Sequence, residues 1–299
     1  MSDRSIEGQL KLFEPVFHGV VPAKDQQDLM TYPFFSLSKK KRIKPIKFDN
    51  GKVKITVTGQ EEHGIANIYD ADILIYVASQ IMEAKNRNQA TSRRIKISQY
   101  DILKFLGKGT GGDRYKRLQE SLERLQSTSV QTTIKRENSR FKHKAMFSWI
   151  ERWQAVVKNG IPIAIEFWVD EWFYEGILEG KILTLPHSYF RIEGGLERFL
   201  YKLCRKIIGS NHSGYVEMKL ENVHKRSGLT RKPSEFLKMV QKISKNQSIP
   251  DYWIFVVNEE RTDSKYLCAY SRLKFETEKA ASANIAINYL QKTISSKGT

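Results

Sequence analysis

The sequence predicts an α+β fold that consists of two tandem winged-helix domains with an N-terminal arm. One observation behind this prediction is the order helix, strand, helix, turn, helix, strand, basic loop and strand between residues 70 and 150. Another is the return of this order after residue 195, as a repeat of elements rather than of letters. A third is that basic side chains concentrate on the last helix and loop of the first unit and on the helices of the second.

Four parts are expected along the 299 residues. They are an N-terminal arm (1–45), a first winged-helix domain with extra strands and a linker (46–192), a second winged-helix domain (193–275) and a C-terminal helix or tail (276–299). The arm holds a short apolar stretch, from Leu10 to Phe17, and a basic run over 39–44. That run is either a solvated linker or an arm that contacts phosphates.

Local signals predict the first elements of the first domain. An Asn-Gly pair at 50–51 between two strand-like runs predicts a hairpin. A helix then opens at Asp70, which is placed to cap it, and apolar residues recur along this helix at helical spacing. After a strand over 93–98, Ser98 caps a second helix that Gly107 ends.

The third helix of this domain and the hairpin after it carry most of its basic residues. The helix over 113–125 has an apolar stripe through Leu118, and its other faces are largely basic. Two strands then flank a basic tip at 135–144, as expected of a wing. Residues 151–192 add strand-like pieces and an aromatic turn, whose acidic neighbours favour core packing over nucleic-acid stacking.

The second domain repeats the order. An amphipathic helix over 196–209 precedes a strand over 215–220 and a short helix that ends before Gly228. Pro233 suits the first turn of the next helix, and a hairpin around 261–265 closes the domain.

The basic excess indicates a polyanionic partner. Fifty Lys and Arg against 33 Asp and Glu leave a formal charge of +17, with a pI of about 9.7. This charge favours nucleic acid over an anionic membrane surface or simple solubility. Residues 113–146 hold nine basic residues against four acidic ones, and 202–245 hold eleven against three. Helices with such faces fit the major groove of double-stranded DNA.

The candidate DNA contacts lie on the third helix and basic loop of the first domain and around the second and third helices of the second. The alternative is that these side chains only keep the surface solvated. In the first domain the candidates are Arg114, Arg117, Ser121, Arg124, Lys135, Arg136, Arg140, Lys142 and Lys144. In the second they are Lys225, Arg226, Arg231, Lys232, Ser234, Lys238 and Lys242.

No motif indicates catalysis. The stretch GKGTGGDR has the glycine spacing of a phosphate loop, but Asp113-Arg114 replaces the required Lys-Ser/Thr. The six His form no His-x-His pair of the kind a metal-dependent nickase needs. We therefore expect no enzymatic activity, no cofactor and no metal site.

Two cysteines, Cys204 and Cys268, give no disulfide framework and lie in apolar segments. Free buried thiols fit a reducing bacterial cytoplasm. Neither a signal peptide nor a membrane span is expected, because no apolar run is long enough.

Several stretches together closely resemble the plasmid replication initiator protein A family of bacterial replicons. They are IYDADILIYVASQI, RRIKISQYDILKFLGKGTGGDRYKRLQESLERLQSTSVQTTI, IEFWVDEWFYEGI and ILTLPHSYFRIEGGLERFLYKLCRKIIG. The resemblance covers about residues 45–275, and its most specific parts are the helix within TGGDRYKRLQESLERL and the helix LERFLYKLCRK.

The resemblance implies a non-enzymatic initiator with recognition helices at 113–125 and 232–245. Such a protein binds direct repeats (iterons) at a plasmid origin, bends the duplex, helps an A·T-rich element to open, and recruits a host replicative helicase or initiator. Related initiators form dimers through the first winged helix. The alternatives are a winged-helix transcriptional repressor or autoregulator without an initiation role, and a basic protein that binds RNA or membranes. RNA binding predicts exposed aromatic residues on a sheet, whereas the aromatic residues here follow core periodicity.

Overall fold

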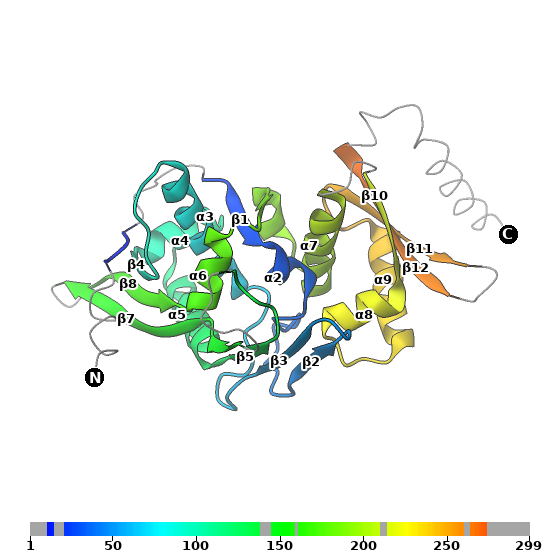
Figure 1. The fold of residues 1–299 in the computed structure, drawn as a ribbon, viewed down its shortest axis with the longest axis horizontal. Coiled ribbons are helices and arrows are strands. Elements are labelled where there is room, and N and C mark those ends of the chain that lie inside the picture. Colours follow the sequence, from blue (N-terminus) through cyan, green and yellow to red (C-terminus); the bar gives the residue numbers. More distant parts are fainter. Residues whose placement is uncertain are drawn as a thin grey trace. The chain divides into compact units, whose positions relative to one another are not determined.

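The computed structural model describes residues 11–14, 21–137, 145–158, 161–209, 214–259 and 264–273. Within these residues it shows an α+β protein whose strands form four small sheets. The chain separates into two units (Figure 1). The first comprises residues 1–196 with 226–229, and the second comprises 197–225 with 230–299. The second unit therefore begins a few residues after the border expected at 192.

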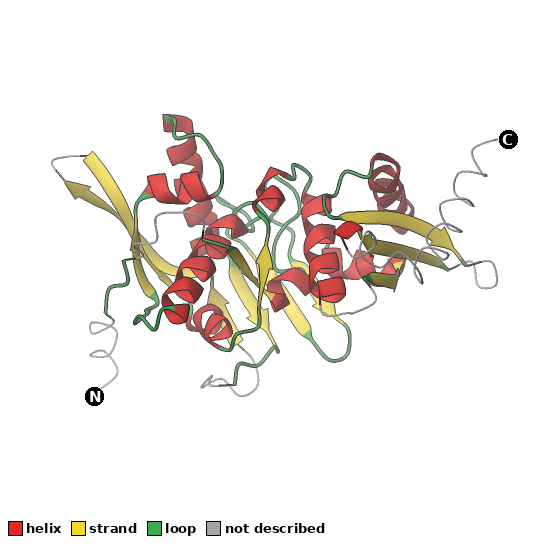
Figure 2. Cartoon of the chain, turned by 90° about the horizontal axis from the view of Figure 1, so that it is seen from above, coloured by secondary structure: helices red, strands yellow, loops and turns green. Residues whose placement is uncertain are grey.

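The first unit contains the expected order of elements around a three-stranded sheet. Strand β4 pairs with β8, and β8 pairs with β7, so the last two strands form a hairpin that extends the sheet. This hairpin projects from the unit in both ribbon views (Figures 1 and 2). The elements are α3 (Ala71–Asn86), β4 (Arg94–Ile97), α4 (Gln99–Phe105), α5 (Gly112–Ser127), β7 (Ile150–Lys158) and β8 (Ile161–Val169).

The hairpin predicted as the wing belongs to another sheet. Strands β5 and β6 do pair with each other, but β5 also pairs with β3, which places them in the order β2-β3-β5-β6. The prediction of a wing at 135–144 is therefore wrong, because the hairpin that joins β4 is β7–β8. The strands of this second sheet are β2 (Ile46–Asp49), β3 (Lys54–Thr58), β5 (Ser129–Thr132) and β6 (Ala145–Ser148).

Much of the expected N-terminal arm is part of the first unit. Strand β1 (Ala23–Gln26) pairs with β9 (Ile182–Leu185), and α2 (Gln27–Thr31) follows it. Phe34 and Phe35 are buried, and the Phe35 ring stacks on Trp149 at 4.9 Å between centroids. These aromatic side chains remove enough apolar surface from water to hold the segment on the unit.

The aromatic turn predicted at 170–177 is helix α6 (Glu171–Leu178), followed by β9 and a 3-10 turn, η1 (His187–Arg191). Trp172 and Phe173 are buried, and Phe147 stacks on Trp172 at 4.9 Å. The expectation that this cluster packs in the core is confirmed. Near the N-terminus, Phe13 adds a short parallel bridge to β4 at Ile95.

The second unit repeats the order helix, strand, helix, helix and hairpin that the first unit shows in α3, β4, α4, α5 and β7–β8, without an inserted β5–β6 hairpin. Its sheet also places the first strand beside the last, in the order β10-β12-β11, and α9 packs on β11. On one face of this sheet, half-buried aromatic side chains surround Cys268 and Tyr270. Aromatic residues of this unit therefore also lie on the face of a sheet. The elements are α7 (Gly195–Gly209), β10 (Tyr215–Lys219), α8 (Leu220–Ser227), α9 (Pro233–Asn246), β11 (Tyr252–Asn258) and β12 (Lys265–Ser271).

Several predicted turn and cap residues have the expected geometry. The Ser98 hydroxyl accepts a hydrogen bond from the Tyr100 N–H at 3.2 Å, and Gly107 ends α4 with a φ of 63°. Gly51 has a φ of 83° in the β2–β3 turn, and Pro233 is the first residue of α9. Asp70 is the exception, because its carboxylate makes no capping hydrogen bond to α3.

Candidate nucleic-acid interface

Helix α9 presents a basic face opposite its buried stripe. Phe236, Val240 and Ile243 are buried. The residues about half a turn away from them are exposed and carry no acidic group, and they are Ser234, Lys238, Gln241, Lys242 and Lys245. Glu235 is the one acidic residue of α9, and it pairs with Arg231. The amines and amides on the opposite face can therefore reach phosphates and the acceptor edges of bases.

The N-terminal end of α9 adds more cations, some of them paired. Lys232 is exposed at the N-cap. The Arg231 guanidinium lies 3.3 Å from the Glu235 carboxylate, an exposed pair that competes only weakly with a phosphate. The positive end of the helix dipole favours an anion here as well.

The candidates on α8 are engaged locally. The Lys225 ammonium lies 2.5 Å from the Glu221 carboxylate, and this contact lowers the pKa of Glu221 below its usual value. The Arg226 guanidinium sits over the Tyr32 ring, 5.4 Å from its centroid, and is half-buried. Lys225 is therefore exposed with an exposed counter-ion, whereas Arg226 is held within the first unit.

Helix α5 has a mixed surface. Leu118, Leu122 and Leu125 are buried, as its apolar stripe predicts. Arg114 and Arg117 are exposed. Acidic side chains share the helix, because Asp113 is exposed and Glu120 and Glu123 are half-buried. The attraction of α5 for a polyanion is weaker than that of α9 for this reason.

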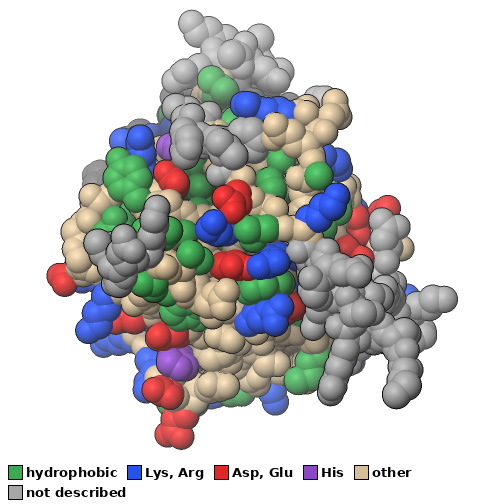
Figure 3. Space-filling model, turned by 90° about the vertical axis from the view of Figure 1, so that its left-hand side faces the viewer, with side chains coloured by type: hydrophobic (Ala, Val, Ile, Leu, Met, Phe, Trp, Pro, Cys, Tyr) green, Lys and Arg blue, Asp and Glu red, His purple; other side chains and the backbone are tan. Residues whose placement is uncertain are grey.

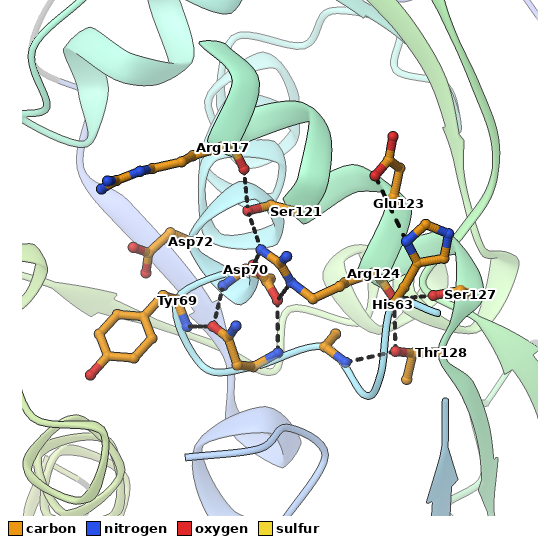
Figure 4. A network of polar contacts seen from close by, with 12 residues as sticks. His63, Tyr69, Asp70, Asp72, Arg117, Ser121, Glu123, Arg124, Ser127 and Thr128 are labelled. Carbon is orange, nitrogen blue, oxygen red and sulfur yellow. Dashed lines mark hydrogen bonds and ion pairs between the residues drawn. The ribbon is translucent and has the colours of Figure 1, made fainter. Parts of the chain in front are cut away.

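Arg124 is held by a buried carboxylate (Figure 4). Its Nε and Nη2 lie 2.9 and 2.8 Å from the two Asp70 oxygens, and Asp70 is 1% exposed. This hydrogen-bonded pair raises the pKa of the Arg124 guanidinium. The bidentate geometry uses the same fork that would recognise a guanine or a phosphate. The structure thus places Arg124 as an anchor between α5 and the start of α3.

The anchor continues into a network of backbone contacts. Asp70 also accepts a hydrogen bond from the Asn67 N–H at 2.8 Å, which explains why its carboxylate does not cap α3. The Ser121 hydroxyl accepts a hydrogen bond from Arg124 Nη2 and donates one to the Arg117 carbonyl. Thr128, after the last turn, accepts from the Ala66 N–H at 2.7 Å. Ser121 is therefore half-buried and bonded on both sides.

Arg136 was predicted as a DNA contact of the basic wing, but the structure places it in the core. Its side chain is 1% exposed, and the guanidinium donates to the Trp172 carbonyl at 3.1 Å and lies 2.7 Å from Asp28. It also lies over the Trp172 ring at 3.7 Å. A Cβ on Gly176 would come within 2.6 Å of this group, so Gly176 leaves the space it occupies. Arg136 therefore stabilises the core and does not face a ligand.

The rest of that basic loop is only partly described. Lys135 is exposed beside Arg136. The remaining candidates of the loop lie outside the described residues, and they are Arg140, Lys142 and Lys144.

Exposed polar residues of the two helices that were missing from the candidates include two lysines and a glutamine. Lys116 lies on the first turns of α5, and Gln241 and Lys245 extend the face of α9. The signal for Lys245 was present, because its position continues the spacing from Lys238 through Lys242. Whether such a residue can contact a ligand depends on its exposure and on the absence of an acidic neighbour. Both are properties of the folded chain.

Elsewhere on the first unit, basic and acidic side chains alternate. Arg93 pairs with Glu151, and Arg94 pairs with Glu166, on the sheet that contains β4 and β8. The face seen in Figure 3 likewise shows Lys and Arg side chains interspersed with Asp and Glu. Such pairing leaves little net field for a polyanion.

Other chemistry finds little support in the described part of the chain. Its His, Cys, Asp and Glu side chains form no cluster that could hold a metal ion. Both cysteines are free and buried, and burial raises the pKa of Cys204 to about 12 and that of Cys268 to about 11. Among the same residues, no helix has the length and apolar character that crossing a bilayer requires.

Comparison with known proteins gives three findings. A family model described as replication initiator protein A matches residues 24–254. A protein of Wigglesworthia glossinidia brevipalpis, whose name assigns it by inference to replication, is 28% identical over 228 residues, covering 75% of this chain and 81% of that protein. The crystal structure of domains 2 and 3 of RctB has a TM-score of 0.54 at 13% identity, covering 81% of this chain and 97% of that one. This structural likeness concerns the fold alone.

Proposed function

Because the chain belongs to the replication initiator protein A family, we propose that it binds direct repeats at a plasmid origin and starts replication there. The observation that carries this proposal is the exposed face of α9, with Lys238, Lys242 and Lys245 and no acidic group. Neutralised phosphates release counterions, and side chains at this spacing lie along one side of a helix that fits the major groove.

In this proposal each unit is a winged helix, with α5 and α9 as recognition helices. The shared order of helix, strand, helix, helix and hairpin supports it, as does the sheet order that places the first strand beside the last in both units. The wing of the first unit is then β7–β8, and that of the second is β11–β12. Two helices on one repeat would read two segments of major groove.

The later steps of initiation are proposed on family membership. Binding would bend the duplex at a cost of a few kcal/mol, which the added phosphate contacts offset, and so help an A·T-rich element to open. The opened origin would receive the host helicase or initiator. We propose that the protein itself is not an enzyme, since these steps need binding energy only, and that copies pair through the first unit.

Footprinting on the parental replicon tests this function. Origin and promoter DNA are probed at several salt concentrations with the intact chain and with a Lys238→Gln/Lys242→Gln/Lys245→Gln variant. Regularly spaced protected direct repeats, lost in the variant, are the expected result. The logarithm of the affinity should fall with that of the salt concentration, with a slope of about −0.9 for each phosphate contacted.

Two results would contradict the proposal. Protection of a single inverted repeat over a promoter, without origin binding, would favour a transcriptional repressor. Unchanged repeat protection in the triple variant would show that α9 does not read the repeat. Permanganate sensitivity of an A·T-rich element, which appears only with the bound protein, distinguishes an initiator from an autoregulator that merely occupies the same DNA.

A further inference from the structure

The basic run at 39–44 lies on a fixed backbone rather than in a free linker. At its start, the Ser36 N–H donates to the Ala66 carbonyl at 3.0 Å and the Ser36 carbonyl accepts from Ile68 at 2.9 Å. At its end, the Ile65 N–H donates to the Arg42 carbonyl at 2.8 Å. The run is therefore attached at both ends to the segment 65–68.

Arg42 and Gly64 fix the interior of this loop. The Arg42 guanidinium folds back onto its own loop, with Nε 2.9 Å from the Lys44 carbonyl and Nη2 3.3 Å from that of Pro45. Gly64 has a φ of 75°, and a Cβ there would lie 2.7 Å from Lys41 Cγ. Arg42 is thus the one of the five cations that holds the loop backbone in place. The missing side chain at Gly64 lets Lys41 pack closely against it.

The other cations of the loop point into solvent. Lys39, Lys40, Lys41 and Lys44 are exposed, and among the described residues none of the four ammonium groups lies within 4 Å of a carboxylate. Lys39 lies over the Tyr69 ring at 4.8 Å, and Lys41 reaches the Glu62 carbonyl at 3.4 Å. The ammonium groups themselves make these contacts, to a ring face and to a carbonyl, and neither partner carries a formal charge.

The segment beneath the loop also holds α5. Ala66 donates to Thr128 at the end of α5, and Asp70 binds Arg124 within it. The loop and the proposed recognition helix of the first unit are therefore connected through a few directly bonded residues. Phosphates beside a recognition helix are where sequence-independent contacts position a DNA-binding protein.

We propose that residues 39–44 form a preorganised phosphate-binding loop that contacts the DNA backbone beside α5, with Lys39, Lys40 and Lys44 as its cations. This inference rests on the proposed binding of duplex DNA and adds a contact that carries no sequence information. Lysine suits the role, because its ammonium is a point charge that attracts phosphate without the fork that reads a base.

A Lys39→Gln/Lys40→Gln/Lys44→Gln variant tests the loop. The matched control removes three exposed lysines outside the loop and outside α5 and α9, namely Lys85, Lys104 and Lys219. Affinity for an origin duplex and for an unrelated duplex of equal length is measured by fluorescence anisotropy at four salt concentrations. We expect the loop variant to lose about 10- to 100-fold on both duplexes, with the salt slope reduced by about 2 to 3. The control should lose much less.

An Arg42→Lys variant separates charge from preorganisation. It keeps the net charge but removes the bonds to the loop carbonyls, so binding to both duplexes should weaken by about 2- to 10-fold. Thermal unfolding of each variant establishes that the first unit remains folded.

The outcomes distinguish this inference from the proposed function. If the loop variant keeps its affinity and slope while the α9 triple variant loses repeat binding, the loop inference is overturned and the proposed function stands. An equal loss in the control also overturns it, since only total charge would matter. If the intact chain does not prefer origin DNA, the proposed function fails, and the unrelated duplex still decides the loop.

Discussion

The two units share an order of elements but use their cations differently. In the first, Arg124 and Arg136 bind buried or half-buried carboxylates of the same unit. On α9 of the second, Lys238, Lys242 and Lys245 are exposed, and no described carboxylate lies within 4 Å of them. Arg124 and Arg136 of the first unit thus stabilise its interior, whereas the lysines of α9 are exposed and can contact a ligand.

This contrast shows why a count of basic residues misleads. Residues 113–146 contain nine of them, yet two are neutralised within the unit, and the exposed ones on α5 share that helix with acidic side chains. A cation in a buried pair is costly to remove from its partner, so it is not free to bind a phosphate. Of the two helices, α9 should therefore supply more of the affinity than α5.

The largest expected effect breaks an anchor of the first unit. Arg136→Ala leaves the Asp28 and Glu179 carboxylates without their buried partner. We expect a loss of about 3–5 kcal/mol in the free energy of unfolding, measured by urea denaturation. Lys135→Ala, one residue away and exposed, should change it by less than about 0.5 kcal/mol. Similar losses in the two variants would place Arg136 outside the core.

Arg124→Ala should have the next largest effect. Asp70 would remain buried without a counter-ion, and we expect a loss of about 2–3 kcal/mol, since the Arg124 side chain is 24% exposed. A double-mutant cycle with Asp70→Asn measures the coupling, because removing both charges should restore part of the stability. A coupling near zero would mean that the pair does not hold α5, and Arg124 would again be a candidate DNA contact.

Matched triple variants compare the two proposed recognition helices directly. Lys238→Gln/Lys242→Gln/Lys245→Gln should weaken repeat binding by about 100-fold at moderate salt, from three lost phosphate or base contacts. Arg114→Gln/Lys116→Gln/Arg117→Gln removes the same charge from α5 and should cost about 10-fold, because acidic neighbours already weaken that face. Anisotropy titrations measure both. A larger loss from α5 would reverse the comparison.

The last expected effect concerns pH and the first unit alone. Burial raises the pKa of Asp170 to about 7. Between pH 4 and 7 the folded state thus holds a proton that the unfolded chain has released, and stability should fall as pH rises through this window. Asp170→Asn keeps an acceptor for the Trp172 N–H and cannot ionise, so its melting temperature should gain on that of the unaltered protein between pH 4 and 7. Glu61→Gln, at an exposed position, serves as the control and should show a constant difference.

Short-range features could be read from the sequence because neighbouring residues determine them. Ser98 caps, Gly107 ends a helix, and Pro233 begins one through contacts within a few residues. The buried stripe of α9 follows the same logic, and with it the exposed face opposite. These local rules also predicted the order helix, strand, helix, helix and hairpin that both units contain.

Long-range partners could not be read in this way. Both β5–β6 and β7–β8 follow α5 as hairpins, and only their pairing with β3 or with β4 distinguishes an inserted sheet from the proposed wing. Arg136 lies in a basic stretch, but its buried position depends on its ion pair with Asp28, which is 108 residues earlier in the chain. Asp70 likewise has the sequence position of a cap and the structural role of a counter-ion.

The short bridge between Phe13 and β4 has a practical consequence for shortened versions of the protein. The Phe13 N–H donates to the Arg94 carbonyl, and the Lys96 N–H donates to the Phe13 carbonyl, so this segment closes one edge of the β4-β8-β7 sheet. A chain that begins after Glu14 would leave these β4 groups open to strands of other molecules. Self-association of such a truncated protein would then reflect an exposed edge created by the cut, and its oligomeric state would be a poor guide to that of the intact initiator.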